Sequence, residues 1–259
     1  MLHRTARGEG RTLLMVHGFA VDHRILTPLD GAAARAGWRR LYADLPGMGR
    51  SAGVPAASTD DVLDALEQVV DAEIGTEPFA VLGASYGGLL ARCLAARRPG
   101  QVAGVGLLCP VVGEVRDLPP RHVARADPAL LAALDPEEAE AFAEVAVVQS
   151  PATWALFRDH VLPGLRAADQ GALARIRAHY APSRTPEADA PFAGPTLLVA
   201  GRHDHVVGYR DALRLLADHP RATVAVLDDA GHNAHLERPD VAGALVTEWL
   251  GRVGAAVSG

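Results

Sequence analysis

The chain has 259 residues, of which 49% are hydrophobic, and a net charge of −6 with a pI near 6.0. This length and apolar content suffice for one large core, and α/β folds of this size are commonly single domains. The acidic balance argues against a nucleic-acid partner, because binding to phosphates needs clustered cations. All 25 basic residues are Arg, so chemistry that depends on a lysine amine is excluded within this chain.

Short apolar runs that are typical of strands alternate with amphipathic runs that are typical of helices. The predicted strands cover residues 12–16, 39–43, 79–82, 102–108, 196–200 and 223–227. The predicted helices cover residues 26–35, 59–74, 86–97, 209–217 and 241–253. This alternation predicts an α/β fold with a mostly parallel sheet that is covered by helices on both faces.

Between Pro110 and Pro195 the alternation stops, and the sequence favours helices without intervening strands. Helix starts are predicted at Asp135-Pro136 and near Pro151 and Gln170. We therefore expect a core domain formed by residues 1–110 and 195–259, and a helical cap inserted at residues 111–194. Residues 254–259 are expected to be disordered, as chain ends often are.

The two cysteines lie in a predicted apolar helix (Cys93) and at the end of a predicted strand (Cys109), so we expect buried free thiols. No apolar stretch reaches the length that spans a membrane, and residues 1–7 lack the hydrophobic segment of a secretory signal. We therefore expect a cytoplasmic protein without a membrane partner. The sequence does not indicate the oligomeric state.

A candidate nucleophile lies in the motif Gly83-Ala84-Ser85-Tyr86-Gly87, between a predicted strand and a predicted helix. A sharp turn at this point forces the serine into a sparsely allowed backbone conformation and exposes its hydroxyl group. Side chains two residues before and after the serine would collide, which explains Gly83 and Gly87. The alternative is an ordinary helix start with Ser85 as its N-cap.

Two further polar residues follow late strands. Asp204 comes shortly after the strand that ends at residue 200, and His232 comes after the last predicted strand. The carboxyl ends of parallel strands lie along one edge of a sheet, so Ser85, Asp204 and His232 are expected to converge there.

The order Ser, Asp, His, each just past its own strand, resembles the α/β-hydrolase family over essentially the whole chain. The matching pieces are Val16-His17-Gly18-Phe19, Asp44-Leu45-Pro46-Gly47-Met48-Gly49-Arg50-Ser51, the turn at Ser85, Asp204 and Gly231-His232. The resemblance implies an α/β-hydrolase fold. Because only residues 1–10 precede the early strand, we expect a reduced sheet of about seven strands.

The resemblance also implies a catalytic triad. Ser85 would attack an acyl carbonyl, His232 would accept its proton and later deliver it to the leaving group, and Asp204 would orient the imidazole. The backbone N–H groups of Phe19 and Tyr86 match the two oxyanion donors of the family. The residues expected to support these positions are His17, Gly18, Gly83 and Gly87.

Alternatives for individual residues stay open. Glu114 and Asp117 follow the strand that ends near residue 108, a place from which some family members supply the acid. His203, Asp204 and His205 have the ligand types of a metal site, but alternating loop residues need further partners to bind an ion. We expect no metal and no cofactor, and a structural role for His235. Asp44 is expected to fix the following turn through bonds to backbone amides.

A serine at the turn disfavours the haloalkane dehalogenase and epoxide hydrolase activities of relatives that carry aspartate there. The remaining chemistry is hydrolysis of a small-molecule acyl substrate through an acyl-enzyme: an ester, lactone, thioester, amide or activated carbon–carbon bond. A carbon–carbon bond hydrolase and a cofactor-free perhydrolase are alternatives with the same triad. A receptor-like binding protein with little turnover is the alternative from another class.

Overall fold

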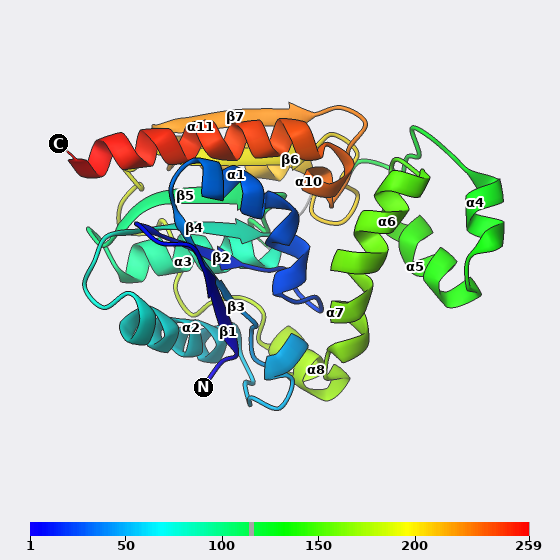
Figure 1. The fold of residues 1–259 in the computed structure, drawn as a ribbon. Coiled ribbons are helices and arrows are strands. Elements are labelled where there is room, and N and C mark those ends of the chain that lie inside the picture. The colour runs from blue at the N-terminus through cyan, green and yellow to red at the C-terminus, as the bar shows by residue number, and fades with distance from the viewer. Residues whose placement is uncertain (114–116, 259) are drawn as a thin grey trace.

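A computed structural model describes residues 1–113 and 117–258 of the chain, and its centre is one sheet with helices on both faces (Figure 1). Its strands are β1 (Arg4–Arg7), β2 (Thr12–Val16), β3 (Arg39–Ala43), β4 (Phe79–Ala84), β5 (Val102–Leu108), β6 (Thr196–Gly201) and β7 (Ala222–Leu227). They are arranged in the spatial order β1-β3-β2-β4-β5-β6-β7. The predicted sheet of about seven strands is confirmed.

Strand β1 is the exception to the parallel arrangement. It pairs antiparallel with β3 at the edge of the sheet, with Arg4 opposite Ala43, whereas the other neighbouring strands pair in parallel. The strands from β2 to β7 therefore all end along the same edge. The segments that follow them are brought together there, although they are far apart in the sequence.

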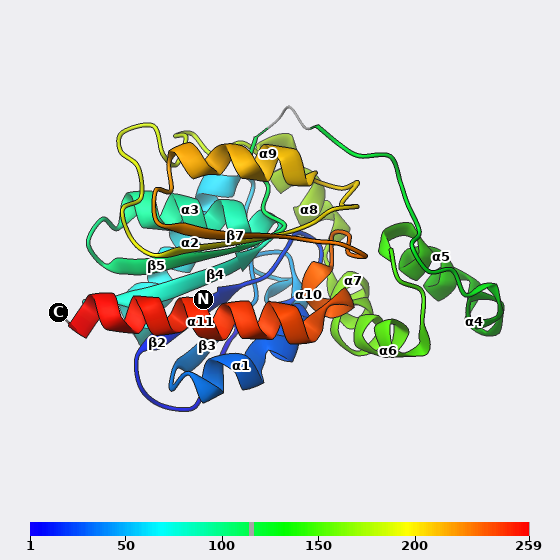
Figure 2. The ribbon, with the colours of Figure 1, turned by 90° about the horizontal axis from the view of Figure 1, so that it is seen from above.

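Helices cover both faces of this sheet. The core helices are α1 (Asp30–Arg35), α2 (Thr59–Glu73), α3 (Tyr86–Arg97), α9 (Tyr209–Arg214), α10 (Ala234–Glu237) and α11 (Pro239–Ser258). Figure 2 shows α2, α3 and α9 on one side of the sheet and α1 and α11 on the other. In the described part of the chain, no helix is long and apolar enough to cross a membrane.

Three short 3₁₀ helices complete the core, at His23–Leu29, Gly49–Ser51 and Leu215–Ala217. The first corrects the predicted helix over residues 26–35, because a 3₁₀ turn begins at His23 and only α1 is α-helical. Pro28 lies inside this turn and has no N–H group to continue an α-helical ladder. The side chain of Asp22 accepts a hydrogen bond from the backbone N–H of Arg24 and caps the start of the turn.

The predicted disorder of residues 254–259 is wrong for the described residues, because α11 continues to Ser258. The preceding Val253 is fully buried. The side chain of Arg11 also donates a hydrogen bond of 2.8 Å to the backbone oxygen of Gly254. These contacts hold the last turns of the helix against the core.

In the described residues between β5 and β6 the chain forms five helices. They are α4 (Pro128–Ala133), α5 (Pro136–Val145), α6 (Pro151–His160), α7 (Leu162–Ala167) and α8 (Gln170–Ala178). The predicted starts match α5, α6 and α8, whereas α4 and α7 were not predicted. In both ribbon views α4 and α5 project away from the sheet (Figures 1 and 2). The division into a core and a cap at residues 111–194 stays a prediction.

The segment between α8 and β6 is joined to the core by a buried ion pair. Arg92 on α3 donates two hydrogen bonds of 2.6 Å to the carboxylate of Glu187; the Arg92 side chain is buried and that of Glu187 is 9% exposed. Burial would raise the pKa of Glu187, but the hydrogen bonds from His219 and Arg92 and the charge of Arg92 lower it to about 2. The ionised pair is therefore the favoured state of the folded protein at neutral pH.

We predict that Arg92→Met lowers the free energy of unfolding at pH 7 by about 3–5 kcal/mol, because it leaves Glu187 as a buried, partly compensated charge. The pKa of Glu187 is lower in the folded than in the unfolded chain. The stabilisation should therefore be complete above the ordinary value of 4.5 and should be lost as the pH falls toward about 2. Urea unfolding at pH 7 and pH 3 measures both effects.

The matched control is Arg166→Met, which removes the pair between Arg166 and Glu138 on the surface of the helical segment. The Arg166 side chain is 65% exposed, so this change should cost no more than about 1 kcal/mol. Equal losses in the two variants would contradict the assignment of Arg92 and Glu187 as a buried structural link.

Candidate active site

The turn between β4 and α3 forces Ser85 into an unusual conformation. Its backbone angles are φ 53° and ψ −116°, a region that a residue with a side chain occupies at a cost of about 1–3 kcal/mol. A Cβ atom at Gly83 would lie 2.0 Å from the backbone oxygen of Gly87, and one at Gly87 would lie 2.1 Å from that of Val16. Only glycine fits at these two positions.

Hydrogen bonds hold the backbone of this turn. The N–H group of Ser85 donates to the oxygen of Leu108 at 2.8 Å, and its own oxygen accepts from Gly88 at 2.9 Å and from Val111 at 3.0 Å. The turn is thus fixed both to α3 and to the end of β5. The strain at Ser85 is therefore maintained by its surroundings.

Asp204 and His232 form a direct pair. The ring Nδ1 of His232 lies 3.0 Å from Oδ2 of Asp204, whose other oxygen accepts hydrogen bonds from the N–H groups of Val206 and Val207. Burial would raise the pKa of Asp204, but the charge of His232 and these hydrogen bonds lower it. An ionised Asp204 accepts a hydrogen bond from the Nδ1–H group of His232, and in the corresponding neutral tautomer Nε2 is the nitrogen without a proton.

Ser85 and His232 line the same cavity, which has a volume of about 1120 Å³. They follow β4 and β7, and Asp204 follows β6 between them in the spatial order. In the described residues no hydrogen bond joins the hydroxyl of Ser85 to His232. Such contacts are often long in unliganded enzymes and tighten when substrate binds.

The loop after β2 passes close to this turn. Phe19 and Gly18 line the cavity, and a Cβ atom at Gly18 would lie 3.3 Å from Cβ of Ser85. His17 is fully buried, with Nδ1 2.7 Å from the oxygen of Gly18 and Nε2 accepting from the N–H of Leu45 at 2.9 Å. Burial lowers the pKa of His17, so its neutral ring carries the proton on Nδ1 and ties the loop to the segment after β3.

Sequence reasoning did not assign Tyr180, which packs on both predicted oxyanion residues. Its ring centre lies 5.6 Å from that of Phe19 and 4.9 Å from that of Tyr86, and Phe19 and Tyr86 are themselves 5.5 Å apart. The hydroxyl of Thr59 donates to the backbone oxygen of Tyr180 at 2.7 Å and lies 2.9 Å from the hydroxyl of Tyr86. This aromatic cluster connects the segment between β5 and β6 with the loop and the turn.

Glu237 was also missed. Its Oε1 accepts hydrogen bonds from Val147 at 2.6 Å and Val148 at 3.0 Å, and its Oε2 accepts from Gly231 at 2.6 Å. Burial and the charge of Asp204 raise the pKa of Glu237, and the three backbone hydrogen bonds lower it by less, so that the pKa lies above its ordinary value. The carboxylate joins the helical segment to the residue beside His232. The sequence shows only an acid on a short helix, so it carries no signal for this role.

The alternative acids are placed differently. Asp117 pairs with Arg210 at 3.1 Å, its side chain is 46% exposed, and its backbone N–H donates to Asp211. Glu114 lies outside the described residues. Asp204 is therefore the acid that contacts His232 in the described structure.

Two side chains of the loop around Asp204, those of His203 and Asp204 itself, have separate partners. Nε2 of His203 lies 3.5 Å from the carboxylate of Asp228, and its ring packs against that of His122 in a tilted arrangement with a centre distance of 4.3 Å. Because Asp204 is bound to His232, these neighbouring residues do not gather around one point. The arrangement does not favour a metal site here.

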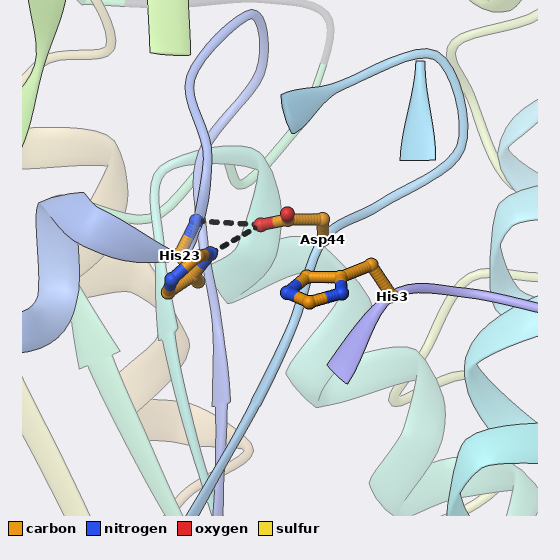
Figure 3. A group of neighbouring side chains, drawn as sticks. All are labelled: His3, His23 and Asp44. Atoms are coloured by element: carbon orange, nitrogen blue, oxygen red, sulfur yellow. Dashed lines mark hydrogen bonds and ion pairs between the residues drawn. The ribbon is translucent and has the colours of Figure 1, made fainter. Parts of the chain in front are cut away.

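A different cluster has the ligand types of a metal site. His3, His23 and Asp44 each offer one ligand atom, and these atoms lie within 4.8 Å of one another (Figure 3). The Oδ1 of Asp44 accepts from the backbone and the ring of His23, and its Oδ2 accepts from the N–H of Arg50. These bonds explain the buried carboxylate without an ion. Asp44 thus contacts a backbone amide of the turn that follows it.

The family assignment follows from comparison with known proteins. Residues 13–244 match the model of the alpha/beta hydrolase family. The chain belongs to this family. A solved alpha/beta superfamily hydrolase from Oenococcus oeni is 25% identical with a TM-score of 0.89, and the match covers 98% of this chain and 96% of that one.

The chain is also similar in sequence to two proteins whose names state an activity. The chain is 30% identical over 247 residues to 2-succinyl-6-hydroxy-2,4-cyclohexadiene-1-carboxylate synthase of Salmonella schwarzengrund. This match covers 92% of this chain and 92% of the synthase. It is 36% identical over 106 residues to pimeloyl-[acyl-carrier protein] methyl ester esterase of Shewanella woodyi. That second match spans 40% of this chain and 38% of the esterase. The protein is thus an α/β hydrolase with an esterase among its relatives.

We predict that Glu237→Gln lowers the free energy of unfolding by about 1–3 kcal/mol, because either orientation of the amide places its NH₂ group against a backbone donor. Urea unfolding at pH 7 measures this loss. The control is Glu248→Gln on α11, whose side chain is 51% exposed and whose pair with Arg252 should contribute no more than about 1 kcal/mol. A Glu237→Gln protein as stable as the control would show that the three hydrogen bonds do not support the fold.

Proposed function

We propose that the protein is a serine hydrolase that cleaves a small carboxylic ester through an acyl-enzyme intermediate. The observation that carries the proposal is the pair of His232 with the buried Asp204, together with a strained Ser85 that lines the same cavity as His232. The family assignment and the esterase among the relatives support the same reaction class. In this proposal residues 111–194 act as a cap over the cavity.

The proposed reaction begins with attack of Ser85 Oγ on the ester carbonyl carbon, while Nε2 of His232 accepts the hydroxyl proton. Asp204 stabilises the imidazolium that forms and does not itself become protonated. Collapse of the tetrahedral intermediate breaks the carbon–oxygen bond, and His232 gives its proton to the leaving alcohol. Water then repeats these steps on the acyl-enzyme and releases the carboxylic acid and free Ser85.

The negative oxygen of the tetrahedral intermediate needs fixed donors. We assign this role to the backbone N–H groups of Phe19 and Tyr86, the second of which lies at the start of α3. Removing one such donor costs about 10²–10³ in rate in a well-studied hydrolase. The bonds of His17 to Gly18 and Leu45 position the first donor, and the close approach of α3 to β2 positions the second.

The cavity favours a substrate with an apolar part. Its volume of about 1120 Å³ slightly exceeds the usual range of small-molecule sites, and its wall includes Leu89, Phe157, Val161 and Leu165. An acyl chain of several carbons can be buried against these side chains. The segment between β5 and β6 provides most of this wall and is therefore expected to set the acyl preference.

A second candidate is chemistry on a cyclic carboxylate of the kind named for the Salmonella synthase, and the extent of that match favours it. We place the ester hydrolase first, because an esterase is among the relatives and attack on an ester needs no group beyond the proposed triad and oxyanion donors. Steady ester turnover that depends on Ser85 separates the first candidate from the second and from a receptor-like protein.

We predict that Ser85→Ala and His232→Ala each lower kcat for p-nitrophenyl acetate by about 10⁴–10⁶. Asp204→Asn should keep a measurable remnant, with kcat reduced by about 10⁴ at most, because the nucleophile and base remain but the imidazole tautomer is wrong. Release of p-nitrophenolate, followed at 25 °C and corrected for spontaneous hydrolysis, gives all three values.

The control for the acid is Asp117→Asn, whose side chain pairs with Arg210 away from His232. This variant should retain wild-type turnover. If Asp117→Asn lost activity while Asp204→Asn kept it, the acid would have to be reassigned. Full activity of Ser85→Ala would overturn the mechanism.

A further inference from the structure

We propose that Arg177 binds a carboxylate on the acyl part of the substrate, so that the preferred substrates are half-esters of dicarboxylic acids. This inference rests on the proposed function and names its substrate class. Arg177 lies in the last turn of α8 and is one of the residues that line the cavity of Ser85 and His232. Among the described residues of that lining it is the only arginine.

Arg177 is held by an aromatic ring and not by an acid. Its guanidinium carbon lies 5.4 Å from the centre of the Phe19 ring, and in the described residues no carboxylate pairs with it. The arginine at position 166 of the same helical segment does have an acidic partner, Glu138. Because none of the described acids occupies its N–H groups, the guanidinium can accommodate a planar, bidentate carboxylate.

The positive and negative side chains of the cavity wall lie at different places, so they would orient an anionic substrate. Glu144 on α5 is the only carboxylate among the described lining residues, and α5 and α8 lie apart in both ribbon views (Figures 1 and 2). An anionic group is therefore attracted toward Arg177 and repelled from the wall at Glu144. The remaining lining is largely apolar and suits the methylene chain between two carboxyl groups.

The sheet order places Arg177 on the acyl side. Ser85 follows β4, Phe19 follows β2 on one side of it, and His232 follows β7 on the other. The leaving alcohol must depart toward His232, because His232 gives it a proton. The guanidinium over Phe19 lies on the opposite side of the nucleophile, so the carboxylate that it binds belongs to the acyl group.

The test compares monomethyl glutarate, adipate and pimelate with the methyl esters of the monocarboxylic acids that have the same chain lengths. Methanol release gives kcat/KM for each ester. We expect wild type to favour the half-esters, with one chain length best. Arg177→Gln should lower the ratio of half-ester to neutral-ester kcat/KM by about 10–100-fold, the range expected when a charge-assisted hydrogen bond is lost. The loss should appear mainly in KM, and Arg177→Lys should restore part of it.

The matched control is Arg175→Gln, because Arg175 lies on the same helix but does not line the cavity. This variant should leave the ratio at its wild-type value. An unchanged ratio in Arg177→Gln, or equal losses in the two variants, would overturn the proposal. Wild-type turnover of neutral esters that depends on Ser85 would still uphold the proposed function in that case.

A binding measurement tests the subsite without turnover. Calorimetry of monomethyl adipate with Ser85→Ala should show binding that weakens by about 10–100-fold when Arg177→Gln is added. No binding, or binding that does not depend on Arg177, would also overturn the proposal. Arg177-dependent binding by a protein that hydrolyses no ester would instead retain the subsite and refute the proposed reaction.

Discussion

The constraint on which the site depends is the close approach of three backbone segments at the end of β4. Ser85 can remain at φ 53° only because the first turn of α3 packs against β4 and against the end of β2 without side chains in between. At Gly83 and Gly87 even a methyl group would overlap backbone atoms. The same close approach that strains Ser85 places the loop at Gly18 next to it. One packing arrangement therefore positions both the proposed nucleophile and the predicted oxyanion donors.

The segment between β5 and β6 is attached to this arrangement from two sides. Tyr180 packs on Phe19 and Tyr86, and Glu237 joins Val147 and Val148 to Gly231, beside His232. The segment between β5 and β6, which forms part of the cavity wall, therefore contacts both the predicted oxyanion residues and the loop of the proposed base.

Much of the fold could be predicted from the sequence, because parallel strands that are buried on both faces produce clear apolar runs. The meeting of segments after β4, β6 and β7 at one sheet edge follows from this pattern alone. The roles of Ser85, Asp204 and His232 stay a prediction. At Pro28 the missing backbone N–H group produces a 3₁₀ turn where the spacing of apolar residues predicts an α-helix. Helix α11 continues past residue 253 because its end packs on the core.

Other features depend on side-chain directions that periodicity does not specify. The sequence does not show which of Asp117 and Asp204 contacts His232. In the structure Asp117 pairs with Arg210, whereas Asp204 is hydrogen-bonded to His232. Tyr180 and Arg177 lie in a segment without strands, where no sheet edge indicates which residues face the cavity. Glu237 has the sequence context of an exposed helical acid, and only the structure reveals its three backbone donors.

The most direct test of the central claim is intact-mass spectrometry after incubation with a fluorophosphonate, which reacts with an activated serine whatever the natural substrate. The account predicts one adduct on the wild-type protein and none on Ser85→Ala. No adduct on the wild-type protein, or the same adduct on both, would contradict the assignment of Ser85 as an activated nucleophile.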